Sequence, residues 1–283
     1  MDEREVRACW EANAEGWTAL SRMGYDRCRD LFNTPTFMRM LPDVEGLRGL
    51  DIGCGEGHNT RLLARRGARM TAFDFAETFV RHAREAERQE PLGIGYLVAT
   101  ASRLPFADAA FDFATAFMSF QDIADPEAAV AEACRVLRPG GFLQFSITHP
   151  CFQTPQFGWI RDETGRKVAL TVGDYFREPG CRVDEWIFGT APAELKARYP
   201  KFRTPYFERT LSGWLNLLLG AGFRLEAFAE PTVDDATLAA HPEEYDSRLI
   251  AFFLQVRCRK PGAPSSGQRR PVAGEVVWHS RGA

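Results

Sequence analysis

The chain has 283 residues, of which 45% are hydrophobic and 26% charged, as expected for a folded globular protein. Its formal net charge of −3 gives no basic surplus for binding nucleic acid. The segment Met1–Glu5 is too charged for a secretory signal, and no apolar run is long enough for a membrane span. We therefore expect a cytoplasmic protein that binds neither nucleic acid nor membranes. The seven cysteines are scattered and form no C-x-x-C pair, so neither a disulfide framework nor a metal site is expected.

Residues 1–45 have a helical pattern. Val6, Trp10, Ala14 and Trp17 recur at about one helical turn and would form one apolar face. A second helical piece, 25–41, ends before Pro42. We expect this segment to be an N-terminal helical cap that precedes the first strand.

From residue 47 onward, apolar runs alternate with amphipathic stretches, which is typical of a parallel sheet covered by helices. The expected strands are 47–52, 69–74, 94–98, 111–117 and 142–148, and the expected helices are 57–66, 76–89 and 126–137. The turn Pro139–Gly141 should separate the last of these helices from the strand that follows it.

A glycine-rich turn follows the first strand. Gly53, Gly55 and Gly57 lie at alternate positions, where the absence of Cβ lets a ligand approach the main chain. Asp51 precedes them, and a carboxylate there would repel a pyrophosphate but suit a ligand with an ammonium group. Asp74 ends the second strand, where a carboxylate can accept hydrogen bonds from ribose hydroxyls.

These features, followed in order by Ser102–Phe106, Phe111–Asp112, Asp125–Pro126 and Arg135–Gly141, resemble the class I S-adenosylmethionine (SAM)-dependent methyltransferases of the type 11 group. The resemblance covers about residues 45–150. It implies a Rossmann-like, seven-stranded, mostly parallel α/β sheet with helices on both faces. It also implies SAM as cofactor and S-adenosylhomocysteine as product.

The resemblance assigns the cofactor site to the ends of the first four strands. The expected cofactor-binding residues are Asp51, Gly53, Cys54, Gly55, Gly57, Asp74, Phe75, Thr100, Ala101, Ser102, Phe117 and Met118. Phe75 would pack on the adenine or simply in the core. Thr100 stands where many members carry an acid that meets the adenine amino group, and a hydroxyl is the weaker acceptor. Phe117 and Met118 would line the passage toward the methyl acceptor.

The segment 150–208 interrupts the α/β pattern and is rich in proline, glycine and aromatic residues. Since it follows the fifth strand at the ligand-binding edge, we expect a substrate lid. The core of 46–149 should then be completed by 209–260, with a helix near 210–220 and antiparallel strands near 223–229 and 248–257. The Pro/Gly/Ser-rich segment 261–283 is expected to be a flexible tail.

His149, at the end of the fifth strand, is the candidate catalytic base, with a hydrogen bond to the lid as the alternative reading. The segment after the fifth strand also resembles a bacterial subset of the family, in which a tyrosine-histidine pair stands where this chain has Phe207-Glu208. We therefore expect Glu208 to hold a cationic acceptor. The remaining acceptor-binding candidates are Trp17, Tyr25, Gln121, Asp122, Trp159, Tyr175 and Tyr206, with Asp122 a possible cap of the next loop instead.

Three functions remain open from the sequence. The first is methylation of a small-molecule acceptor at oxygen, nitrogen or carbon in a closed, mostly apolar pocket. The resemblance implies a place in bacterial secondary metabolism for this function. The others are an RNA or protein methyltransferase, and a SAM-binding protein that transfers no methyl group. A monomer and a homodimer are both compatible with the sequence.

Overall fold

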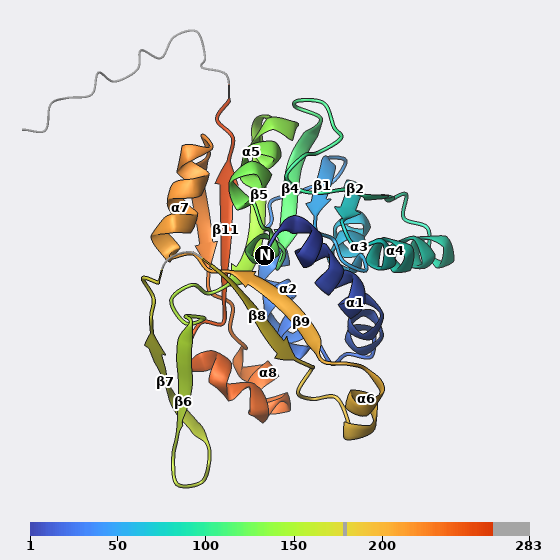
Figure 1. Cartoon of the computed structure of the whole chain (residues 1–283). Coiled ribbons are helices and arrows are strands. Elements are labelled where there is room, and N and C mark those ends of the chain that lie inside the picture. The colour runs from blue at the N-terminus through green and yellow to red at the C-terminus, as the bar shows by residue number, and fades with distance from the viewer. Residues whose placement is uncertain (178–179, 263–283) are drawn as a thin grey trace, which may run out of the picture.

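A computed structural model describes residues 1–177 and 180–262. Its centre is a seven-stranded sheet with the order β10-β11-β5-β4-β1-β2-β3 (Figure 1). The strands are β1 (Arg48–Ile52), β2 (Arg69–Asp74), β3 (Gly95–Val98), β4 (Phe111–Phe117), β5 (Leu137–Thr148), β10 (Arg224–Ala229) and β11 (Phe253–Arg259). Strands β1 to β5 are parallel, β11 runs antiparallel to β5, and β10 antiparallel to β11. This arrangement confirms the predicted mostly parallel α/β fold.

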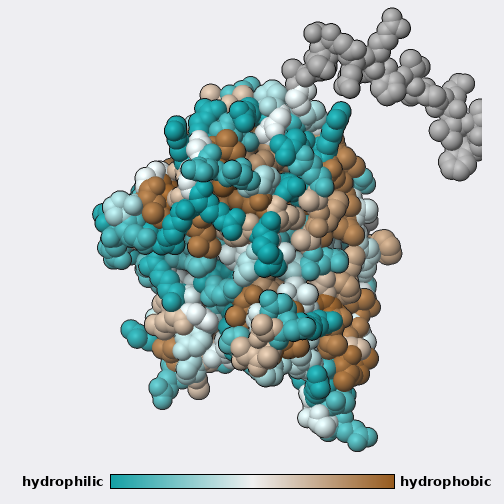
Figure 2. Space-filling model, turned by 180° about the vertical axis from the view of Figure 1, so that it is seen from behind, coloured by the Kyte–Doolittle hydropathy of each residue, from teal (hydrophilic) through white to brown (hydrophobic). Residues whose placement is uncertain are grey.

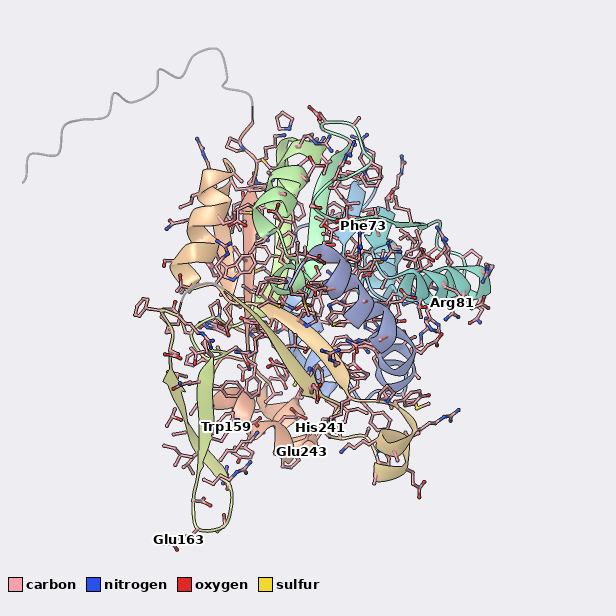
Figure 3. All side chains as sticks on the ribbon, viewed as in Figure 1. Phe73, Arg81, Trp159, Glu163, His241 and Glu243 are labelled. Carbon is pink, nitrogen blue, oxygen red and sulfur yellow. The ribbon has the colours of Figure 1, made fainter. Side chains whose placement is uncertain are left out.

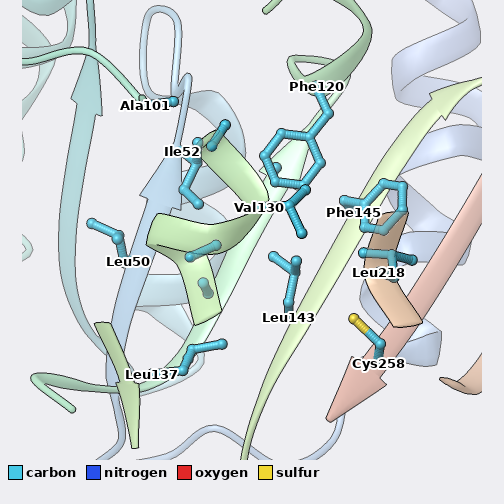
Figure 4. Packing of buried hydrophobic residues seen from close by; sticks show 14 of the residues in the cluster. Leu50, Ile52, Ala101, Phe120, Val130, Leu137, Leu143, Phe145, Leu218 and Cys258 are labelled. Carbon is cyan, nitrogen blue, oxygen red and sulfur yellow. The ribbon is translucent and has the colours of Figure 1, made fainter. Parts of the chain in front are cut away.

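Helices cover both faces of the sheet, and each face has its own apolar cluster. On one face, α5 (Pro126–Val136) and α7 (Leu211–Gly220) pack on β1, β4 and β5, as the close-up in Figure 4 shows. On the other face lie α2 (Thr34–Met40), α3 (His58–Arg65) and α4 (Glu77–Gln89). Because β4 is buried on both faces, it is apolar at nearly every position, as a central parallel strand must be.

Two predicted boundaries are wrong. β5 begins at Leu137 rather than at 142, because Pro139–Gly141 does not leave the sheet. Gly140, at φ +82°, and Gly141 instead exchange main-chain hydrogen bonds with Lys260 at 2.9 and 2.8 Å, next to an irregularity in the register with β4. The last strand begins at Phe253 rather than at 248, because Pro242 opens a 3₁₀ helix, η3 (Pro242–Arg248), that follows α8 (Asp235–Ala240).

The N-terminal segment is helical, as predicted. It consists of α1 (Glu3–Arg22), a π-helical turn η1 (Arg29–Asn33) and α2. α1 begins with a capping box between Asp2 and Glu5, which satisfies main-chain N–H groups that would otherwise lack partners. α1 packs against α4.

The segment 150–208 folds into two separate antiparallel strand pairs. The first pair is β6 (Gln156–Arg161) with β7 (Lys167–Gly173), and the second is β8 (Cys181–Trp186) with β9 (Phe202–Phe207). The helix α6 (Ala193–Arg198) lies between β8 and β9 in the chain. In Figure 1 the β8–β9 pair runs beside α1, whereas β6–β7 projects from the body. Figure 2 shows the molecule from behind, where hydrophobic residues gather toward the lower right.

The β8–β9 pair is joined to α1 by aromatic packing. The Trp17 ring lies 5.4 Å from Trp186, 5.1 Å from Phe188 and 5.0 Å from Phe202, measured between ring centroids. Leu20 of α1 is buried in the same cluster. The N-terminal helix and the insertion therefore form one wall, through residues such as Trp17 and Trp186 that are more than 160 positions apart in the chain.

Candidate functional site

A cavity of about 750 Å³ opens at the carboxyl ends of β1, β2 and β4, within the size range of small-ligand sites. This is the edge at which open α/β sheets bind ligands. Most of its lining comes from three parts of the chain: the strand ends, the segment from α1 to η1, and the β8–β9 pair. The glycine turn lies at one end of the cavity lining, and the insertion supplies the other.

The three glycines of the turn all have positive φ, of +69°, +54° and +87° at Gly53, Gly55 and Gly57. A Cβ on Gly53 would lie 2.5 Å from the Cβ of Ser119, and one on Gly57 2.6 Å from the hydroxyl of Tyr96. A Cβ on Gly55 would meet no atom within 4 Å. Gly53, Cys54 and Gly55 line the cavity, whereas Gly57 does not. Gly57 therefore shapes the turn, and Gly55 leaves open space for a ligand.

Asp74 fixes the position of this turn. One carboxylate oxygen accepts the N–H of Gly55 at 2.9 Å, and the other accepts the N–H of Ala76 at 2.9 Å. The side chain is buried and lines the cavity, and desolvation raises the pKa of Asp74 to about 6. A carboxylate has about four acceptor positions, so two remain for a ligand.

Asp51 is held by two threonines that the sequence analysis did not select. Its oxygens accept hydrogen bonds from the hydroxyls of Thr60 at 2.5 Å and Thr115 at 2.8 Å. Burial raises the pKa of Asp51. A signal for Thr115 was present, because it is a hydroxyl residue in an otherwise apolar strand and pairs in register with Asp51.

Phe75, Thr100 and Ala101 line the cavity beyond Asp74. Ser102, by contrast, does not line it. The Ser102 hydroxyl lies 2.9 Å from that of Thr100 and donates to the carboxylate of Glu3 at 2.8 Å. Placing Ser102 in direct contact with the cofactor is thus not supported, since its side chain instead ties α1 to this loop. The residues of α1 that line this part of the cavity are Glu3, Val6, Trp10 and Trp17.

Phe117 and Met118 both line the cavity at the end of β4. Met118 has a φ of +56°, a conformation that non-glycine residues seldom adopt and that concentrates at functional sites. Its N–H donates to the carbonyl of Ser146 at 2.8 Å, which holds this backbone against β5.

Comparison with known proteins agrees with this geometry. Residues 50–145 match the sequence family described as "Methyltransferase domain". A ubiquinone biosynthesis O-methyltransferase of Parvibaculum lavamentivorans is 34% identical over 178 residues, which cover 58% of this chain and 70% of the relative. The chain belongs to the class I SAM-dependent methyltransferases.

Two further matches lie within the same class. The crystal structure of a SAM-dependent methyltransferase from Mesorhizobium loti superposes with a TM-score of 0.66 at 29% identity, covering 80% of this chain and 96% of that one. A malonyl-[acyl-carrier protein] O-methyltransferase of Methylococcus capsulatus is 43% identical over 101 residues, 35% of this chain and 36% of the relative. The enzyme is thus a SAM-dependent methyltransferase, and the open space at Gly55 beside the buried Asp74 carboxylate fits that cofactor.

Of the eight residues predicted to bind the acceptor, five line the cavity. They are Trp17, Tyr25, Gln121, Asp122 and Tyr206. The insertion adds residues that the sequence analysis did not select, among them Arg182, Asp184, Trp186 and Thr204. The sequence analysis noted only that the segment is rich in aromatic residues. No local pattern shows which residues of the insertion face the core.

His149 does not line the cavity of the methyltransferase. Its Nδ1 accepts the N–H of Cys151 at 3.2 Å, so the proton lies on Nε2, which donates to the carboxylate of Glu230 at 2.9 Å. Burial lowers the pKa of His149. With both ring nitrogens engaged and the residue 3% exposed, the geometry gives His149 a structural position and does not support its role as a base.

Three further acceptor candidates also lie outside the cavity lining. The Tyr175 hydroxyl accepts the N–H of Leu211 at 2.8 Å, and Glu208 accepts from Arg182 at 3.1 Å. Trp159 lies on the projecting β6–β7 pair, where Lys167 stands 4.5 Å from its ring, and Figure 3 shows it far from Phe73. The prediction that these three contact the acceptor is not supported, because each packs or pairs within the insertion or its junction with α7.

The described residues also bear on other expectations. None of the helices in the described ranges is both long and apolar enough to cross a membrane. Within residues 1–177 and 180–262, no cluster of three or more His, Cys, Asp or Glu side chains is arranged to hold a metal ion. Most of the predicted tail, 263–283, lies outside the described residues.

Proposed function

We propose that this methyltransferase acts on a small molecule that binds between the cofactor and the β8–β9 pair. The observation that carries the proposal is the continuous cavity, which joins the glycine turn to the insertion. Bound SAM supplies an electrophilic methyl group on its sulfonium sulfur. The acceptor end then needs to align a nucleophile and exclude water.

The chain's own residues divide these tasks. The Asp74 carboxylate would accept hydrogen bonds from the ribose hydroxyls, and the open space at Gly55 would admit the rest of the cofactor. The aromatic wall of Trp17, Trp186 and Phe188 lines the cavity and keeps water from its acceptor side. The segment 150–208 would thus be the substrate lid, with β8–β9 as the part that faces the acceptor.

The relatives support a small acceptor. The relative from Parvibaculum lavamentivorans is an O-methyltransferase of ubiquinone biosynthesis. We extend this to the present enzyme, which would methylate an oxygen, nitrogen or carbon atom of a small molecule in bacterial secondary metabolism. The net charge of −3 argues against RNA as the acceptor.

Transfer of radiolabelled methyl from SAM into an extract of the organism that carries the gene tests the proposal. We expect label in the small-molecule fraction with the wild-type enzyme and at least tenfold less with Asp74→Asn, which weakens the cofactor site. Label confined to RNA or protein would overturn the proposal. Salt-sensitive retention on RNA would support the RNA alternative.

A further inference from the structure

Asp122 is half-buried in the cavity wall, and no structural task explains its position there. It ends the short 3₁₀ turn η2 (Phe120–Asp122) after β4, and its carboxylate lines the cavity. Its one hydrogen bond among the described residues comes from the Gln121 amide, at 3.4 Å. The next helix, α5, is capped by Asp125, which accepts the N–H of Ala128 at 2.9 Å. Asp122 is therefore not the cap of that loop.

Three other carboxylates of the cavity are more firmly held than that of Asp122. Asp51 and Asp74 each accept two short hydrogen bonds, and Asp184 accepts two from the Arg182 guanidinium at 2.7 and 3.0 Å. A half-buried carboxylate with one long hydrogen bond has acceptor capacity left for a bound molecule.

Two uncharged oxygen atoms of the same cavity lining also have unused hydrogen-bonding capacity. The Gln121 Oε1 and the Thr148 Oγ1 are buried and make no hydrogen bond of good geometry among the described residues, although the Tyr206 hydroxyl lies beside Thr148. Both residues line the cavity, and Gln121 is 4% exposed. Because buried polar atoms are nearly always paired, these atoms indicate a ligand that donates hydrogen bonds.

Desolvation, and to a lesser extent the charges around Asp122, make it a stronger base than an exposed aspartate. Asp74 and Asp184 are the charged neighbours that act on it, and both are acidic. Tyr206 and the Cys181 thiol are the other titratable groups close enough to be affected by its charge. The nearest cation of the insertion, Arg182, is paired with Asp184 and Glu208. Burial raises the pKa of Asp122 well above its usual value.

We propose that Asp122 is the proton acceptor of methyl transfer, and that the acceptor is a molecule with an O–H or N–H group that is methylated while Gln121 and Thr148 accept its further hydrogen bonds. This inference rests on the proposed function and narrows it. The bond from the acceptor oxygen or nitrogen to the methyl carbon forms as the sulfur–methyl bond breaks, and that electron pair stays on sulfur. The acceptor's proton passes to a carboxylate oxygen of Asp122, which later releases it to water.

The test compares Asp122→Asn with Glu163→Gln, a charge removal at the exposed tip of the β6–β7 turn (Figure 3). Calorimetry with S-adenosylhomocysteine should give dissociation constants within threefold of wild type for both variants. In the labelling assay, Asp122→Asn should slow transfer to the small-molecule fraction about 100-fold at pH 7, in the range of general-base effects. The loss should shrink as pH rises and the acceptor ionises unaided, whereas Glu163→Gln should match wild type.

A second measurement does not depend on activity. In protein labelled with ¹³C at aspartate carboxyls, the resonance absent from Asp122→Asn should titrate well above the usual range of an aspartate. Thr148→Val should raise the KM for the small molecule that takes up the labelled methyl group, while kcat stays within threefold of wild type.

Several outcomes would overturn the proposal. One is an unchanged rate and pH profile in Asp122→Asn, and another is titration of Asp122 near pH 4. A third is a tenfold loss of S-adenosylhomocysteine affinity in Asp122→Asn, which would place Asp122 at the cofactor. Small-molecule labelling that Asp122→Asn does not slow would leave the proposed function standing and remove only the base. Wild-type label confined to RNA or protein would overturn both.

Discussion

The two ends of the cavity are built on different principles. At the cofactor end, the polar groups already have partners: Asp74 accepts two main-chain N–H groups, and Asp51 accepts two threonine hydroxyls. At the acceptor end, Gln121 and Thr148 each leave a buried acceptor unpaired in the described structure. The first end is already held by hydrogen bonds within the protein, whereas the second has buried acceptors that a bound molecule would pair under our proposal.

This contrast follows from where the residues come from. The cofactor end uses β1, the glycine turn and α3, which are contiguous in the chain, together with Asp74 and Thr115 at the neighbouring strands β2 and β4. The acceptor end joins α1, η2 and the insertion, and its shape depends on contacts such as Trp17 with Trp186. Changes at the first end should therefore affect folding and cofactor binding, whereas changes at the second should affect acceptor use.

The largest effect is expected from Gly53→Ala. The new Cβ would lie 2.5 Å from that of Ser119, whose hydroxyl is fixed on the carbonyl of Ile52 at 2.7 Å, and φ is +69°. Left-handed strain and overpacking together should cost roughly 2–5 kcal/mol, or about 10 °C in Tm. Calorimetry should then detect no S-adenosylhomocysteine binding.

Gly55→Ala is the matched control for this change. It carries the strain of φ +54° but no clash, since no atom lies within 4 Å of its Cβ. The cost in stability should be about 1–2 kcal/mol. Affinity should still fall at least tenfold, because the methyl group points into the space left for the cofactor. Equal loss of Tm in the two variants would contradict this account of the turn.

A smaller effect, with a clear pH dependence, is expected from Asp74→Asn. Losing charged hydrogen bonds to the ribose should weaken S-adenosylhomocysteine binding about 10- to 100-fold. Since the pKa of Asp74 is raised to about 6 and the ionised form is the better acceptor, wild-type affinity should fall as pH drops below 6. Asp74→Asn should remove that fall. A pH-independent wild-type affinity between pH 5 and 7 would contradict the assignment.

The same contrast explains how far the sequence could predict the structure. Strands 69–74 and 111–117 were predicted to the residue, because their apolar runs end sharply at an aspartate and at the turn after Phe117. The start of β5 was wrong because its pairing partner, Lys260, lies more than 100 positions away. The local sequence pattern predicts strands and helices well. It does not predict the distant residues whose hydrogen bonds decide where a strand begins.

The active-site predictions divide in the same way. Asp51, Asp74 and the glycines belong to one local motif, and all but Gly57 line the cavity. His149 was chosen for its chemistry, but the alternation of a strand decides which side chain faces the ligand. Thr148, one position earlier, lines the cavity instead. The packing of Trp17 on the insertion could not be predicted from any local feature.

His149→Gln should therefore affect stability rather than catalysis. Losing the hydrogen bonds to Glu230 and Cys151 should cost about 1–3 kcal/mol, while kcat stays within threefold. Because burial lowers the pKa of His149, the unfolded chain takes up a proton first as pH falls below about 6.5, and the wild type should lose stability there. Urea unfolding between pH 5 and 8 checks whether the variant reduces this slope. A large drop in kcat at unchanged stability would restore His149 as a base.

The smallest effect is expected from Glu208→Gln, which tests the boundary of the acceptor end. Glu208 was predicted to hold a cationic acceptor, but it lies outside the cavity lining and bonds to Arg182. Arg182 keeps both hydrogen bonds to Asp184 when Glu208 loses its charge, so its position over the Tyr206 ring should persist. The KM for the labelled acceptor should change less than threefold. A rise of tenfold or more, with unchanged S-adenosylhomocysteine affinity, would mean that the acceptor site extends past Arg182 and that the insertion rearranges when the acceptor binds.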